Sequence, residues 1–136
     1  DGIEKNRIVD YIFDNNLQEI VNLRGNVDKM TVKKAFQKAH FLVFISKSEG
    51  WPKVVAEAMF WSCLPITTAV SCVPYMVDNG NRGALVKADK EQIANQIEIY
   101  LKNEKLYQKQ IENAKNWSQK FTLEKFESEI KELLKS

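Results

Sequence analysis

Residues 41–57 read FLVFISKSEGWPKVVAE, and this stretch decides the fold class. Its first five residues, 41–45, are all apolar and do not alternate with polar ones. A strand covered by helices on both faces has this composition, because neither side meets water. Pro52 suits the first turn of a helix, where its missing N–H has no intrahelical partner to lose. The stretch therefore predicts a buried strand at 41–45, a loop at 46–52 and a helix at 53–62.

Helices and strands alternate on both sides of this stretch. Short apolar segments predict further strands, at 20–23, 65–68 and 84–86. Helical spacing of apolar residues, with Thr31 as the N-cap of the second helix, predicts helices at 3–15, from 31 onward, and at 89–102, 104–118 and 122–135. We therefore expect an α/β fold: a Rossmann-like parallel sheet with flanking helices that ends in helices. Because the chain begins directly with a helix, we expect 1–136 to be one N-terminally truncated, partial domain.

Length and composition indicate a single soluble globular unit. Lys and Arg number 20 against 18 Asp and Glu, a net charge of +2, so nothing points to nucleic acid as a partner. Cys63 and Cys72 lack the pair spacing of a zinc site and are expected to be reduced thiols of a cytosolic protein. No apolar run reaches the length of a membrane helix, and the N-terminal residues are too charged for a signal peptide. The expected location is the cytoplasm.

The loop at 46–52 connects the carboxyl end of a strand with the start of a helix. Ligands of open α/β sheets bind outside the carboxyl ends of the strands, and a helix start offers free N–H groups and a positive dipole end to a phosphate. Glu49 precedes this helix and Glu57 lies about one turn inside it. Carboxylates repel phosphate but accept hydrogen bonds from paired hydroxyls, and a nucleotide-sugar carries hydroxyls on both flanks of its diphosphate. The pattern therefore favours a nucleotide-sugar site.

Glu49-Gly50-Trp51-Pro52 followed by Glu57-Ala58-Met59 resembles the glutamate–seven residues–glutamate motif of retaining glycosyltransferases of the group 1 class, family 4, which have the GT-B fold. The resemblance covers nearly the whole chain, because NLRGNV at 22–27, VPYMVDNG at 73–80 and GALV at 83–86 also resemble family segments. Two positions depart from the family pattern. Ser62 replaces a glycine after the motif helix, and Tyr75 replaces a glutamate in the next helix.

The resemblance implies a role for each residue of the motif. Glu49 would contact the hydroxyls of the donor sugar and is the expected catalytic residue, and Glu57 would hold the ribose hydroxyls. Backbone N–H groups near Lys53 and Val54 would face the distal phosphate. Gly50 and Trp51 would lie close to the sugar. The residues expected to border the base are Ser46, Gly25, Asn26 and Val27.

The resemblance also implies a function. The chain would be the donor-binding half of an enzyme that transfers a sugar from a UDP- or GDP-linked donor, with retention, to a glycan or lipid-linked acceptor. No metal and no cofactor are expected. The acceptor domain, and the basic pair that neutralises the donor diphosphate, would precede this chain, so the chain alone is expected to be inactive.

Other interpretations stay open. Glu49 and Glu57 could be solvated surface acids or a glycosidase pair, although a glycosidase explains neither the helix start nor the adjacent Gly-Trp-Pro. His40 is expected to be structural. The chain could belong to another GT-B enzyme, such as a nucleotide-sugar epimerase, or be a catalytically silent fragment that packs against a partner. The lysine-rich tail reads as a solvated helical face, with a weak contact at the inner face of the membrane as the alternative.

Overall fold

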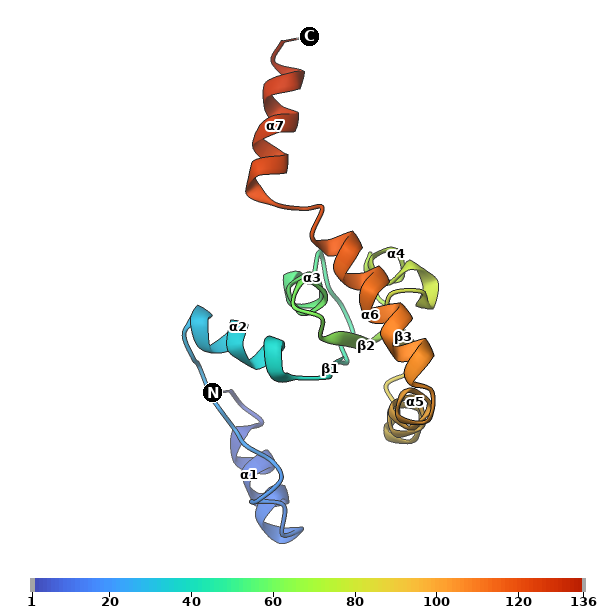
Figure 1. The fold of residues 1–136 in the computed structure, drawn as a ribbon. Helices are drawn as coiled ribbons and strands as arrows, with labels where there is room; N and C mark the ends of the chain where they lie inside the picture. The colour runs from blue at the N-terminus through green and yellow to red at the C-terminus, as the bar shows by residue number, and fades with distance from the viewer. Residues whose placement is uncertain (1, 136) are drawn as a thin grey trace. The chain divides into compact units, whose positions relative to one another are not determined.

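The computed structural model describes residues 2–135, and its sheet confirms the predicted fold class (Figure 1). The strands are β1 (Phe41–Phe44), β2 (Leu64–Thr68) and β3 (Ala84–Val86). They are parallel and lie in the order β1-β2-β3, with Phe41 opposite Leu64 and Ile66 opposite Ala84. The ends of the chain, residues 1 and 136 of the predicted domain, lie outside the described residues.

Helices precede, connect and follow the strands. They are α1 (Lys5–Asp14), α2 (Lys29–Lys38), α3 (Lys53–Phe60), α4 (Val73–Met76), the 3₁₀ helix η1 (Asp78–Gly80), α5 (Lys90–Lys102), α6 (Glu104–Ser118) and α7 (Leu123–Leu133). Contacts divide the chain into two compact units, one ending at Val32 and the other beginning at Lys33. The second unit holds all three strands and is the part in which the candidate site is built.

The core of the second unit lies on both faces of β2. One cluster joins buried side chains of α3, α4 and α6, and its members are Val55, Met59, Val73, Met76, Val77, Ala114 and Trp117. The other joins Leu64, Ile66 and Ala84 of the sheet to Tyr100 of α5. All five residues of β2 are buried. The central strand is therefore the one that helices cover on both faces.

β1 does not have the full burial predicted for residues 41–45. Val43 is 45% exposed and Ile45 37% exposed, while the other side chains of β1 are half-buried. The prediction of complete burial was wrong, because β1 pairs only with β2 among the described residues and forms an edge of the sheet. Edge strands have one side without a neighbour.

The strand predicted at 20–23 is not formed. The N–H groups of Ile20 and Val21 both donate to the carbonyl of Leu17, at 3.0 and 2.8 Å, so this segment begins as a turn. A β-strand exists only where its backbone groups pair with a neighbouring strand, and the apolar sequence alone does not supply that partner.

The N-cap of α2 was also predicted at the wrong residue. Thr31 lies inside α2, and Asp28 is the capping residue: its Oδ1 accepts from the Thr31 N–H at 2.9 Å and its Oδ2 from the Thr31 hydroxyl at 2.8 Å. These hydrogen bonds lower the pKa of Asp28. By contrast, the predicted cap Thr122 is confirmed, because its hydroxyl accepts from the Lys125 N–H.

The helix predicted at 53–62 begins as expected and ends two residues early, at Phe60. Ser62 has a φ of +66°, the left-handed conformation that often ends a helix and that glycine adopts at least cost. The serine at this departure from the family pattern therefore adopts the backbone that a glycine would favour. Pro52 is the N-cap and not a residue of the first turn.

The two cysteines agree with the prediction of free thiols. Cys63 and Cys72 are not joined in a disulfide. Burial raises the pKa of Cys63 to about 11, because removal from water disfavours the thiolate. Cys63 is thus a neutral core residue.

Gly83 is required where β3 approaches β2. Its φ is +151°, and a Cβ added there would lie 2.6 Å from the carbonyl oxygen of Pro65. Because Pro65 belongs to the buried central strand, that oxygen has little freedom to move. Any side chain at Gly83 would push β3 away from β2.

We predict that Gly83→Ala lowers the free energy of unfolding by about 1–3 kcal/mol, through steric overpacking at Pro65. Urea unfolding measures this loss. Gly50→Ala is the matched control, because a Cβ added at Gly50 would have no atom within 4 Å. Equal stability of the two variants would contradict the close approach of β3 to β2.

Candidate functional site

The loop between β1 and α3 is fastened to the end of the neighbouring strand. The hydroxyl of Thr68, the last residue of β2, donates to the carbonyl oxygen of Ser46 at 2.6 Å and accepts from the Ser46 N–H at 3.1 Å. Thr68 is 8% exposed, so both bonds are shielded from competing water. The carboxyl ends of β1 and β2 are thereby held together at the edge of the sheet where ligands of such folds bind.

Ser46 in turn holds the predicted catalytic carboxylate. Its hydroxyl oxygen lies 2.8 Å from Oε1 of Glu49 and 3.0 Å from the carbonyl oxygen of Ser48, both acceptors. Glu49 is half-buried in the loop. The structure therefore brings Ser46 and Glu49 together, and the Ser46 hydroxyl restrains the Glu49 carboxylate. Its expected place beside a base stays a prediction.

The start of α3 offers backbone N–H groups that have no bonded acceptor within residues 2–135. Pro52, the N-cap, has no N–H and its side chain makes no capping bond, while its carbonyl accepts from the Val55 N–H at 3.0 Å. The N–H groups of Lys53 and Val54 are the first of the helix and have no preceding turn to bond to. They coincide with the positive end of the helix dipole. This arrangement suits an anion, and the Lys53 side chain adds a positive charge beside it.

Three of the predicted site residues line one hollow. Trp51, Lys53 and Glu57 border a cavity of about 480 Å³. The other lining residues come from α3, the residue after it, the end of α6 and the segment that follows α6, and they are Ala56, Phe60, Trp61, Trp117, Ser118 and Phe121. Trp51 is 49% exposed, so its ring is not packed away under the loop. Glu49 is not among the lining residues; its carboxylate is hydrogen-bonded to Ser46 within the loop.

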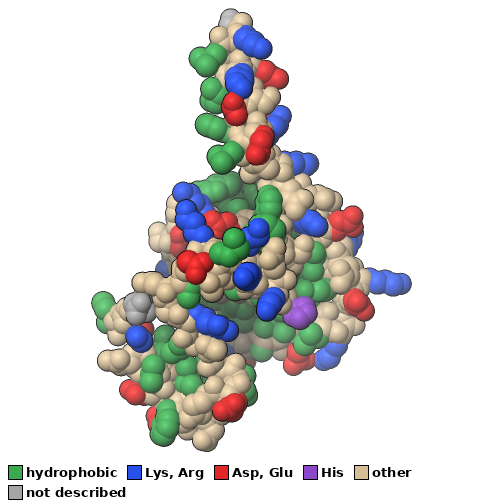
Figure 2. Space-filling view, turned by 60° about the vertical axis from the view of Figure 1, so that its left-hand side comes forward, with side chains coloured by type: hydrophobic (Ala, Val, Ile, Leu, Met, Phe, Trp, Pro, Cys, Tyr) green, Lys and Arg blue, Asp and Glu red, His purple; other side chains and the backbone are tan. Residues whose placement is uncertain are grey.

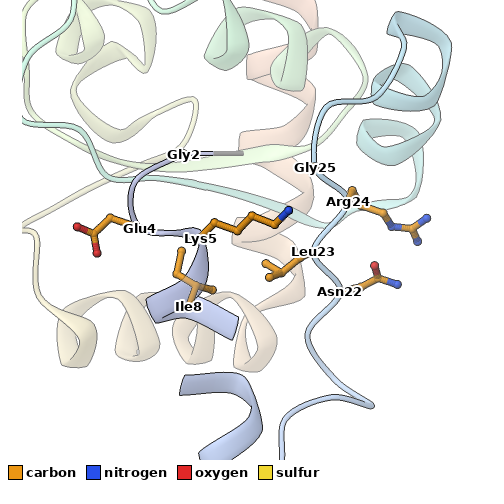
Figure 3. A pocket seen from close by; sticks show the side chains of 8 residues that line it. All are labelled: Gly2, Glu4, Lys5, Ile8, Asn22, Leu23, Arg24 and Gly25. Carbon is orange, nitrogen blue, oxygen red and sulfur yellow. The ribbon is translucent and has the colours of Figure 1, made fainter. Parts of the chain in front are cut away.

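The first unit contains a separate hollow of about 540 Å³ (Figure 3). Gly2, Glu4, Lys5 and Ile8 line it from the side of α1, and residues 22–25 line it from the other side. Leu23 points toward Ile8, whereas Asn22 and Arg24 point away from it (Figure 3). Gly25 belongs to this lining, and Asn26 and Val27 do not. The expected place of Gly25, Asn26 and Val27 beside a donor base stays a prediction.

Sequence reasoning missed the residues at the carboxyl end of β2 and directly after it. Thr68 fixes the loop of Ser46, and Ser71 and Cys72 both contact Gly50. A signal for them was present, because parallel neighbours end at the same edge of a sheet, so polar residues after 65–68 had to lie near those after 41–45. The predicted site included only the loop that follows 41–45 and not the residues that follow 65–68.

Comparisons with known proteins place the chain in a family context. The sequence matches the family described as "Glycosyl transferases group 1" over residues 1–117. An uncharacterized glycosyltransferase of Methanocaldococcus jannaschii is 33% identical over 126 residues, which are 92% of this chain and 36% of that protein. The chain thus spans about a third of the length of this relative.

Two solved structures resemble the chain. A sucrose-phosphate synthase from Thermosynechococcus elongatus matches with a TM-score of 0.81 at 25% identity, over 98% of this chain and 34% of that one. The C-terminal domain of a group 1 family glycosyl transferase from Francisella tularensis matches with a TM-score of 0.70 at 21% identity, over 82% of this chain and 58% of that one. At that identity the second match shows the fold alone. Within residues 2–135, no helix is both long and apolar enough to cross a membrane.

We predict that Thr68→Val lowers the free energy of unfolding by about 1–3 kcal/mol, because two half-buried backbone groups of Ser46 each lose a hydrogen-bond partner. It should also speed amide hydrogen exchange in the loop at 46–50. Mass spectrometry of exchange and urea unfolding provide the two readouts.

Thr67→Val is the control for this variant. The Thr67 hydroxyl is also buried but makes one long bond, 3.4 Å to the Ala84 carbonyl, on the other side of β2. Its loss should leave exchange at 46–50 unchanged. If Thr68→Val also left that exchange unchanged, the loop would not depend on Thr68.

Proposed function

The chain belongs to the group 1 glycosyl transferases, and from this membership we propose that it binds the nucleotide-sugar donor of a sugar transfer at the amino end of α3. One observation carries the proposal: the uncapped start of α3 lies at the carboxyl edge of a parallel sheet, with Glu49 before it and Glu57 one turn inside it. Phosphate chemistry suits the helix start, and hydroxyl chemistry suits the two carboxylates.

The distal phosphate of the donor would bind the N–H groups of Lys53 and Val54. These groups need no rearrangement to receive an anion, because no side chain caps them. A preorganised donor pair of this kind stabilises charge that develops on the leaving diphosphate. The ammonium of Lys53, exposed beside the same helix end, would add to the attraction.

Glu49 would accept hydrogen bonds from the hydroxyls of the donor sugar. The Ser46 hydroxyl at 2.8 Å restrains its carboxylate, so a bound sugar would meet an acceptor that is already oriented. Gly50 and Trp51 follow directly in the chain and would form the wall of the sugar site. In this proposal the protein mainly positions the sugar and stabilises charge, while the leaving diphosphate takes the acceptor's proton on the same face.

Glu57 would hold the ribose hydroxyls of a UDP or GDP moiety. Its side chain is exposed and borders the hollow of about 480 Å³ together with Trp51 and Lys53. A carboxylate there can accept from two neighbouring hydroxyls at once. An exposed carboxylate without a bonded partner among the described residues is free to take this role.

The acceptor and the wider reaction are proposed from the family resemblance. We expect transfer with retention to a glycan or lipid-linked acceptor, with the acceptor domain and the basic pair for the diphosphate supplied from outside this chain. No group of three His, Cys, Asp or Glu side chains that could hold a metal occurs among the described residues. The absence of a metal requirement and the cytoplasmic location stay predictions.

The C-terminal helix favours a protein partner over a membrane surface. Apolar side chains gather along one edge of α7 and charged ones along the rest (Figure 2). By helical spacing, Leu123, Phe126 and Ile130 lie on one face of α7, and they are 83%, 63% and 40% exposed. Residues 123–135 carry four glutamates against three lysines, so the helix has no net positive charge to attract an anionic membrane. We propose that α7 packs against another part of the intact protein.

The test of donor binding is a titration of UDP and GDP into the intact gene product and its Glu57→Gln variant. Loss of the ribose contact should weaken binding of the preferred nucleotide at least about tenfold, since hydrogen bonds to charged groups contribute about 1.5–3 kcal/mol. Inorganic diphosphate has no ribose, so its affinity should not fall in the same variant. Isothermal titration calorimetry measures all three ligands.

Glu91→Gln supplies the charge-matched control, because Glu91 is exposed in the first turn of α5. It should bind the nucleotides as the wild type does. Equal nucleotide affinity in the wild type and Glu57→Gln would remove Glu57 from the site. Failure of the wild type to bind either nucleotide would overturn the proposed function.

A further inference from the structure

Ser71 has an unusual backbone conformation in the loop between β2 and α4. Its φ is +48°, in the left-handed region that costs energy for a residue with a Cβ. Its hydroxyl donates to the carbonyl oxygen of Gly50 at 3.1 Å, across 21 residues of sequence. The strained residue therefore contacts the loop that carries the candidate site.

The other residues of this kind have local reasons for a positive φ. They are asparagines and an aspartate, which tolerate the left-handed region, or Ser62, which follows the end of α3. Ser71 lies before a helix and not after one, so no helix end requires its conformation. The positive φ of Ser71 occurs together with its contact to Gly50. Backbone strain of this kind persists where surrounding contacts enforce it, and it is concentrated at functional sites.

Cys72 contacts the same oxygen. Its Sγ lies 3.1 Å from the Gly50 carbonyl oxygen and 4.0 Å from Sδ of Met76, and the side chain is half-buried. A thiol is a weaker donor than a hydroxyl, so Ser71 supplies the larger share of the attraction. Two consecutive residues thus hold one carbonyl of the candidate site from the β2–α4 loop.

We propose that Ser71 and Cys72 are positioning residues that fix the Gly50–Trp51 peptide for donor binding. In a trans peptide the C=O and the following N–H point in opposite directions, and the chain has no cis peptide within the described residues. Holding the Gly50 carbonyl toward the β2–α4 loop therefore directs the Trp51 N–H away from it. Among the described residues that N–H is bonded to no acceptor, so it is available to an oxygen of the donor.

The position of this peptide explains why its orientation matters. It lies between Glu49, which Ser46 restrains, and Pro52, the N-cap of α3. Rotation of the peptide would move both the acid and the first N–H groups of the helix, because they are joined to it by few bonds. Through Gly50, Ser71 and Cys72 thus act on the first N–H groups of α3, which are proposed to bind the diphosphate, as well as on Glu49. The inference rests on the proposed function for its ligand.

The test uses Ser71→Gly in the intact gene product, with two readouts. Glycine adopts a positive φ without strain but lacks the hydroxyl, so the melting temperature should stay the same or rise. Amide exchange at 46–52 should become faster, and affinity for the UDP or GDP that the wild type prefers should fall at least about threefold, a loss of about 0.7 kcal/mol. A residue with only a structural role would change affinity in step with stability.

Ser62→Gly is the matched control. It removes a serine from a positive φ of +66° in the same unit without removing any contact to Gly50. It should keep the affinity and the loop exchange of the wild type. Cys72→Ala should weaken binding less than Ser71→Gly does, and Cys72→Ser, which restores a donor, should recover the wild-type values.

Each outcome has one meaning. If Ser71→Gly keeps both wild-type affinity and wild-type exchange at 46–52, the positioning role is wrong while donor binding stands. If the wild type binds neither nucleotide, the proposed function fails, and with it the role of Ser71 and Cys72 in donor binding. Faster exchange at 46–52 with unchanged affinity would also overturn the positioning role, because the contacts to Gly50 would then order the loop without affecting ligand binding.

Discussion

The paired hydrogen bonds between the Thr68 hydroxyl and the backbone of Ser46 are the interaction on which the candidate site depends. They join the carboxyl ends of two parallel strands, at 2.6 and 3.1 Å, at the point where the chain leaves the sheet. From there, the Ser46 side chain sets the direction of Glu49. Thr68 is the last residue of a strand that is buried along its whole length. The hydrogen bonds of Thr68 therefore connect the loop of the site directly to the core.

The candidate site contains groups that attract a phosphate and groups that repel it. A phosphate is attracted by the uncapped start of α3 and repelled by the carboxylates of Glu49 and Glu57. The two effects are compatible when each carboxylate meets a hydroxyl and the phosphate lies between them on the backbone N–H groups. A ligand with hydroxyls on both sides of a diphosphate satisfies this order, and a simple phosphate does not use the carboxylates at all. A nucleotide-sugar is such a ligand, which is why we propose it for the helix start and the two glutamates of this group 1 chain.

The sequence predicted what depends on local composition and missed what depends on neighbours. The helix start after Pro52 and the cap at Thr122 followed from short-range patterns, and the structure has both. The segment 20–23 is as apolar as a strand, yet strand formation requires a partner that no local pattern encodes. Likewise the exposure of Val43 follows from its place at a sheet edge. The contact of Ser71 with Gly50 joins residues 21 positions apart in the sequence and has no local signature.

The central claim is that a donor diphosphate binds the first N–H groups of α3, and a crystal structure of the intact gene product with the bound nucleotide tests it most directly. We expect phosphate oxygens at about 2.7–3.2 Å from the backbone nitrogen of Lys53 or Val54. The terminal phosphate should lie between the side chains of Glu49 and Glu57. A nucleotide bound with its phosphates away from this helix end, and both N–H groups facing solvent, would contradict the account.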